Sequence, residues 1–153
     1  MADEIATPTE LAALEDLLIS WLDEQLAENP VVAAVDREPG KRRWYVRMRG
    51  EEKDTFTLWL TIGQRTLQFE TYVMPAPEEN HARFYEHLLR RNLDFDAMAF
   101  AIGAEDAIFL TGHLPIGAVD AGELDRVLGE TYVYVERCFR PAMRIGYASR
   151  FAG

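Results

Sequence analysis

The sequence predicts an α+β domain in which helices pack on one face of an antiparallel sheet. Within residues 43–74, three runs of alternating apolar and polar residues are separated by short turn-forming segments. A period of two is typical of strands with one buried face, and short connections permit only antiparallel neighbours. Segments with helical apolar spacing flank these runs, so we expect helices to cover the buried face.

The composition is that of an ordinary globular chain, with 153 residues, 48% of them hydrophobic and 27% charged. We therefore expect residues 1–153 to form one domain, with a core spanning about 8–142. The net charge of −10 disfavours binding to nucleic acid or anionic membranes, which requires a basic surface. The charge is uneven, because acidic residues dominate before Arg37 and a basic cluster occupies residues 41–49.

The cysteine content and the hydropathy predict a cytoplasmic protein. Cys138 is the only cysteine, so the chain cannot form an internal disulfide, which suits a reducing compartment. Residues 1–4 are acidic and lack the basic-then-apolar order of a signal peptide. No apolar run approaches the roughly 18 residues that a membrane span needs, so no membrane contact is expected.

The first predicted helix begins at Pro8 and ends before Pro30. Thr7 is a good N-cap, and Glu10 completes a capping box with it. The residue before a proline is disfavoured in a helix, so Asn29 should end this one. Residues 31–40 are expected to connect the helix to the sheet, and a short extended piece at 31–35 remains an open alternative.

Residues 43–49, 55–62 and 66–74 are the predicted strands of an antiparallel meander. Burial of one apolar face, at about 25 cal/mol per Å², should be the main driving force for the fold. The residues predicted to face the core are Trp44, Val46, Met48, Phe56, Leu58, Leu60, Ile62, Leu67, Phe69 and Val73. The opposite, open face is predicted to carry Arg43, Tyr45, Arg47, Arg49, Thr55, Thr57, Trp59, Thr61, Gln68, Glu70 and Tyr72.

A second helix, opened by Pro77 and continuing to about Arg91, should lead to a hairpin of two further strands. These strands are predicted at 98–102 and 107–113, with a short loop at 103–106. The residues predicted to face the core are Met98, Phe100, Ile102, Ile108 and Leu110. Phe109, Thr111 and His113 would then join the open face, which makes five strands in all.

The third predicted helix follows an N-cap at Asp120, with Glu123 completing the capping box. Residues 131–135 alternate and are rich in strand formers, so a strand is the alternative there. The capping box and the length of the apolar pattern favour a helix. Pro141 is expected to end or kink it. The predicted order is α-β-β-β-α-β-β-α.

The sequence has no pattern of residues that indicates catalysis. The three histidines do not lie with cysteines or carboxylates at metal-ligand spacing. There is no glycine-rich phosphate loop, no nucleophile elbow and no cysteine with a placed base. We therefore predict no catalytic residue, no metal and no cofactor. An enzyme acting through His113 or Asp106 is disfavoured, because neither residue has a placed partner.

The open face is the predicted site of partner binding. Aromatic residues and arginine are enriched where protein surfaces bind, and sheet edges can accept an added strand. The residues predicted to bind a polypeptide are Tyr45, Arg47, Trp59, Tyr72 and Phe109. We expect a homodimer, and the alternative is that a second subunit or the C-terminal tail covers this face. Single-stranded nucleic acid on the aromatic face is a weaker alternative because of the net charge, and a small-molecule-binding domain is another.

Several segments resemble the YbjN family of bacterial sensory transduction regulators. The matching residues lie at 43–47, 56–59, 67–75, 87–92 and 106–110, and the resemblance covers roughly 11–139. It implies a regulatory protein with the fold of type III secretion chaperones, which have the same element order. Those chaperones are small acidic dimers that hold an extended segment of a partner. The resemblance implies their fold without implying a role in secretion.

Overall fold

One antiparallel sheet of six strands, in the order β1-β2-β3-β4-β6-β5, forms the centre of the structure. This is a computed structural model, and it describes residues 4–151. Residues 1–3 lie outside the described part; they belong to the acidic start from which we expected no signal peptide. The strands are β1 (Val32–Arg37), β2 (Arg43–Arg49), β3 (Thr55–Ile62), β4 (Thr66–Met74), β5 (Met98–Ile102) and β6 (Ile108–Pro115).

The α+β class and the antiparallel sheet are confirmed, but the predicted number of five strands is wrong. The extra strand is β1, which lies where a connector was expected and pairs with β2 at the sheet edge. Its side chains are mostly half-buried and its ladder contains a register shift between Val32 and Ala34, so the clean alternation that identifies a strand is missing. Pairing with β2 stabilises it where its own pattern is weak.

The predicted division of the meander into a buried and an open face is confirmed. Every predicted core residue of β2, β3 and β4 is buried. Ile102 is the exception in the later hairpin, since 55% of it is exposed. It is the last residue of β5, the edge strand.

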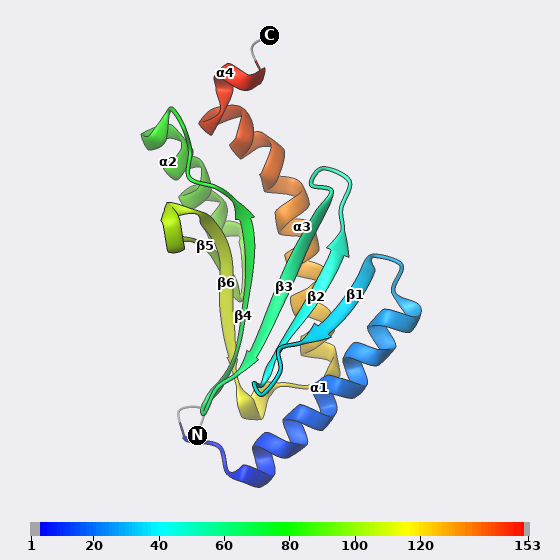
Figure 1. The fold of residues 1–153 in the computed structure, drawn as a ribbon. Coiled ribbons are helices and arrows are strands. Elements are labelled where there is room, and N and C mark those ends of the chain that lie inside the picture. Colours follow the sequence, from blue (N-terminus) through cyan, green and yellow to red (C-terminus); the bar gives the residue numbers. More distant parts are fainter. Residues whose placement is uncertain (1–3, 152–153) are drawn as a thin grey trace.

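Four helices complete the fold, namely α1 (Pro8–Glu28), α2 (His81–Arg91), α3 (Ala121–Gly146) and the short α4 (Ala148–Phe151). Figure 1 shows α2 and α3 behind the sheet, with α1 alongside β1. The capping box of Thr7 and Glu10 is present, and α1 ends at Glu28 as predicted. The indole N–H of Trp21 donates to Asp125 at 2.8 Å, which ties α1 to α3.

The opposite charges of the N-terminal half meet within one chain. Glu15 on α1 forms ion pairs with Arg37 at 2.6 Å and with Arg42 at 3.1 Å. The guanidinium groups of Arg42 and Arg37 lower the pKa of the Glu15 carboxyl. The acidic first helix therefore has a basic counterpart in its own β1–β2 hairpin.

The second helix begins later than predicted, at His81 rather than Pro77. Asn80, which precedes it, has a left-handed backbone with φ of 53°. The amides of Glu78 and Glu79 both donate to the carbonyl of Gly146 at the end of α3. These amides are used to join two segments, and the helix begins only after Asn80.

Helix α3 is continuous over 26 residues and includes residues 131–135, so the predicted helix is confirmed there and the alternative of a strand is wrong. The hydroxyl of Thr131 donates to the Val127 carbonyl one turn earlier, at 2.7 Å. The buried face of this segment includes Thr131, Tyr134 and Cys138. The helix continues beyond Pro141 to Gly146.

The β2–β3 hairpin is held to α3 by one carboxylate. The oxygens of Glu136 accept the backbone N–H groups of Glu51 at 2.5 Å and Glu52 at 2.7 Å, and that of Lys53 at 3.4 Å. A Cβ on Gly50 would lie 2.0 Å from the Glu136 carboxylate, so the turn requires glycine there. Glu136 thereby anchors the β2–β3 hairpin end of the sheet to α3.

Substituting Glu136 should destabilise the fold measurably. Hydrogen bonds to a charged group contribute about 1.5–3 kcal/mol, and Glu136 is only half-buried, so we expect Glu136→Ala to lower the free energy of unfolding by about 1–3 kcal/mol. Urea unfolding would measure it. The control is Glu52→Ala, which removes an exposed ion pair with Arg140 and should cost less than about 1 kcal/mol. Equal losses in the two variants would contradict the anchoring role.

Candidate partner-binding face of the sheet

The open face of the sheet is the surface on which the sequence placed its candidate site. The helices of the described chain lie on the other face, as Figure 1 shows. Along β4, residues Gln68, Glu70 and Tyr72 are exposed while their neighbours in sequence are buried. The face is therefore accessible across the middle strands.

All the predicted site residues lie on this face, in two aromatic pairs and one lone arginine. Tyr45 and Trp59 are directly opposite across β2 and β3, with ring centroids 5.1 Å apart and edge to face. Tyr72 and Phe109 are opposite across β4 and β6, at 5.7 Å and also edge to face. Arg47 is exposed and aligned with Thr57 in the β2–β3 ladder.

Charged groups surround the first pair. The hydroxyl of Tyr45 donates to Glu38 at 2.6 Å, and the guanidinium of Arg43 lies 5.8 Å from the centroid of the Trp59 ring. Arg43 also donates to the Thr61 hydroxyl at 3.0 Å. The bond from Tyr45, followed by that from Lys41, lowers the pKa of Glu38, while the same bond with Glu38 raises the pKa of Tyr45.

The second pair is more open to solvent. Tyr72 is 42% exposed, and burial of its ring edge raises its pKa, with a smaller contribution from Glu105. The ammonium of Lys53 lies 5.8 Å from the Tyr72 ring and 4.8 Å from the Phe139 ring of α3. Burial lowers the pKa of Lys53. This lysine therefore links the hairpin tip, the open face and α3.

A shallow polar hollow of about 270 Å³ lies beside the first pair. The ladder aligns Thr61 with Gln68 and Gln68 with His113, while Glu70 lies opposite Thr111. The polar side chains that line the hollow are those of Arg43, Thr61, Gln68, Glu70, Thr111 and His113. Sequence analysis placed these residues on the open face but did not group them as a site. The sequence shows which side chains of each strand share a face, but it does not show the register between strands that aligns these residues.

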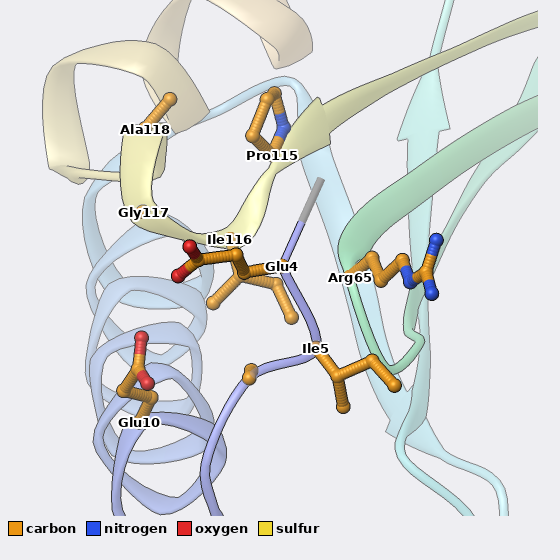
Figure 2. A pocket seen from close by; sticks show the side chains of 9 residues that line it. Glu4, Ile5, Glu10, Arg65, Pro115, Ile116, Gly117 and Ala118 are labelled. Carbon is orange, nitrogen blue, oxygen red and sulfur yellow. The ribbon is translucent and has the colours of Figure 1, made fainter. Parts of the chain in front are cut away.

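A cavity larger than this hollow lies elsewhere, at the end of the sheet where the chain enters α1. It measures about 420 Å³ and is bounded by residues 4–6, Glu10, Arg65 and residues 115–118. Figure 2 shows Glu4 and Glu10 on one side, with Arg65 extending away from them. No cysteine, histidine or serine is among the described residues that line it.

The described chain has no cluster of metal-ligating residues, since no three of its histidines, cysteines and carboxylates come together. Of the histidines, His87 has a pKa lowered first by burial and then by Arg91. Cys138 is buried, and burial raises the pKa of its thiol. A raised pKa disfavours the thiolate that a nucleophile needs.

The C-terminal tail does not cover the open face, so that alternative is wrong for residues up to Phe151. Ser149 donates to Glu79, and Arg150 forms an ion pair with Glu78 at 2.6 Å. These contacts attach α4 to the linker between β4 and α2. A second subunit remains the alternative occupant of the face.

The bond between Tyr45 and Glu38 should stabilise the fold only within a pH window. The lowered pKa of Glu38 gives stability that is full above its ordinary value of about 4.3 and is lost as the pH falls through the folded value. The raised pKa of Tyr45 gives stability that is full below about 10 and is lost as the pH rises through its folded value.

The free energy of unfolding of the native chain should therefore exceed that of Tyr45→Phe by a margin that is greatest between about pH 5 and 10. Urea unfolding across pH measures this margin. The control is Tyr72→Phe, which removes a hydroxyl with no hydrogen bond to the described residues. Below about pH 5, its free energy of unfolding should change with pH in the same way as that of the native chain. A Tyr45→Phe margin that stays constant down to pH 3 would exclude the bond as its source.

Comparison with known proteins identifies a family that matches most of the chain. Residues 16–142 match the YbjN family model, whose description is "Putative bacterial sensory transduction regulator". Uncharacterised proteins of Mycobacterium tuberculosis and Mycobacterium bovis are 34% identical over 104 residues, which is 68% of this chain and 57% of theirs. A Mycobacterium leprae protein is 32% identical over 110 residues, covering 72% of this chain and 60% of its own.

The chain spans less than two thirds of the length of these relatives. Among its described helices, none is both long and apolar enough to cross a membrane. The family match extends from the middle of α1 through the whole sheet to Ala142 in α3, and so includes the open face. The chain belongs to the YbjN family.

Proposed function

We propose that this protein is a non-enzymatic regulatory module that holds an extended segment of a partner polypeptide on the open face of its sheet. The observation that carries the proposal is the open face itself, on which two aromatic pairs flank accessible polar groups while the helices cover the other side. Aromatic rings bury large areas at low entropic cost, and the polar hollow offers partners for peptide N–H and C=O groups.

The family description fits a regulatory role for such a module. The element order predicted from the sequence is that of type III secretion chaperones, and the structure adds β1 to it; from this resemblance we infer a chaperone-like way of holding the partner. We place the protein in the cytoplasm and expect a homodimer, with the second copy bound away from the partner site. The buried lone cysteine suits a reducing compartment.

Two other ligands suit the face less well. Bases of single-stranded nucleic acid need exposed ring faces, whereas these rings contact each other edge to face. Glu38 and Glu70 add negative charge beside the first pair, which opposes phosphate. The hollow of about 270 Å³ is smaller than the roughly 300–1,000 Å³ of typical small-molecule pockets.

Selection from a displayed library of extended peptides would test the proposal. We expect enriched peptides to bind the native protein. Trp59→Ala should weaken their binding at least about tenfold while the chain remains folded, because truncating a central aromatic anchor removes about 2–4 kcal/mol of binding. Fluorescence anisotropy would measure affinity, and circular dichroism would check folding.

The control variant is Tyr132→Ala, which truncates a half-buried aromatic residue on α3, on the helix side of the sheet, where it packs against Phe56. It should leave peptide affinity unchanged. Peptides that bind Trp59→Ala as tightly as the native chain would exclude the open face. Light scattering that shows a dimer converted to monomer by Trp59→Ala would identify a second copy as the occupant.

A further inference from the structure

Strand β5 has a free edge, since it is the last strand on its side of the sheet and pairs only with β6. Antiparallel pairing turns the N–H and C=O groups of alternate residues toward each side of a strand. Ala99 and Ala101 lie opposite Thr111 and Phe109, and the outward groups belong to the residues between them. The contacts of Phe100 establish this parity.

The side-chain amide of Asn92 is bonded to both outward groups of Phe100. Its Oδ1 accepts the Phe100 N–H at 2.7 Å, and its Nδ2 donates to the Phe100 carbonyl at 3.4 Å. One residue of an added antiparallel strand would make the same two bonds. Asn92 therefore occupies the position of an incoming peptide group, while Met98 and Ile102 have the same outward parity.

An apolar groove of about 230 Å³ runs between this edge and α2. It is lined by Tyr85, Leu88, Leu89, Phe100, Ile102 and Ile108. Leu89 is 65% exposed and Ile102 is 55% exposed, so two large aliphatic side chains meet solvent at one place. Leu93, 84% exposed, follows on the turn after α2. An exposed apolar groove beside an unpaired strand edge is suited to an extended segment.

Carboxylates lie at both ends of the edge strand. Asp94 and Asp96 precede β5, and Glu105 and Asp106 follow it; all are exposed, and none has an ion-pair partner among the described residues. Arg90 of α2 does not pair with these carboxylates, because it forms an ion pair with Glu86 at 3.1 Å. The edge is therefore apolar in the middle and negative at both ends.

This charge pattern opposes pairing of β5 with a second copy of itself. In an antiparallel pair of two β5 strands, the carboxylates that precede the strand in one copy would lie toward those that follow it in the other, at both ends of the ladder. Like charges directly opposite in a sheet are destabilising. The complementary ligand has positive ends.

We propose that the β5 edge docks an extended apolar segment of another protein that is flanked by lysine or arginine, with its backbone replacing the Asn92 amide. Side chains of one parity enter the groove beside Leu89 and Ile102, and those of the other parity lie over Ala99 and Ala101. This surface is separate from the aromatic pairs, so the inference does not depend on the function proposed for the open face.

A synthetic peptide of alternating valine and threonine, with two lysines at each end, is the direct probe. We expect it to bind, and the version with glutamates at both ends to bind at least about tenfold more weakly because like charges repel at both ends of the edge. Higher salt should narrow that difference. The Ile102 amide should become protected from hydrogen exchange when the lysine peptide binds.

Asn92→Ala tests whether the Asn92 side chain competes with a docked peptide for the backbone groups of Phe100 or has only a structural role. If its amide occupies the docking position, removing it should tighten peptide binding roughly 2- to 10-fold, the worth of the hydrogen bonds that no longer compete. A residue with a purely structural role would lower stability without tightening binding. If Asn92→Ala fails to fold, protection of the Ile102 amide in the native protein still decides the matter.

The charges are tested by replacing Asp94, Asp96 and Asp106 with asparagine and Glu105 with glutamine in one variant. That variant should bind the two peptides with equal affinity. Trp59→Ala should leave binding at the edge unchanged, which distinguishes this site from the open face. Equal affinity of the native protein for the two peptides, absence of Ile102 protection, or dimerisation through β5 would overturn the proposal.

Discussion

Burial of only one face of the sheet is the constraint on which the rest of the structure depends. The apolar residues of β2, β3 and β4 share one parity, and α1 and α3 complete a single buried cluster with them. A slip of one residue in any ladder would move that apolar set into solvent, so the register is strongly specified. The same alternation necessarily leaves a second face without a cover.

Polar contacts at the margins orient the helices on the sheet. Glu15 connects α1 to the β1–β2 hairpin, Trp21 connects α1 to α3 through Asp125, and Glu136 connects α3 to the β2–β3 hairpin. Exposed ion pairs such as those of Glu15 contribute little to stability individually, so their effect is on geometry, whereas the hydrogen bonds to the Glu136 carboxylate also stabilise the fold. They also mean that the acidic N-terminal half and the basic cluster neutralise each other within one chain.

The two surfaces proposed for binding have different physical character. The open face offers aromatic area and side-chain polar groups, whereas the β5 edge offers backbone hydrogen bonds, an aliphatic groove and negative ends. They are joined by the exposed alanines of β5, which leave the sheet shallow between them. The two proposed surfaces would therefore suit partner segments of different composition.

The sequence alone determined the fold class, the parity of the central strands and most helix ends. These features depend on local patterns, such as the capping box at Thr7 and the alternation from Trp44 onward. It also placed Tyr45, Arg47, Trp59, Tyr72 and Phe109 on one face, because parity within a strand is a local property. The sequence left residues 31–35 open between a connector and a short extended piece, and the tertiary structure identified β1 as a strand, since its pairing with β2 compensates for a weak pattern. Only the ladder register divided the aromatic residues into two pairs and aligned the polar hollow, because register depends on contacts between strands that are distant in sequence. The start of α2 and the bonds of Asn92 likewise follow from groups brought together by folding, the carbonyl of Gly146 and the free edge at Phe100.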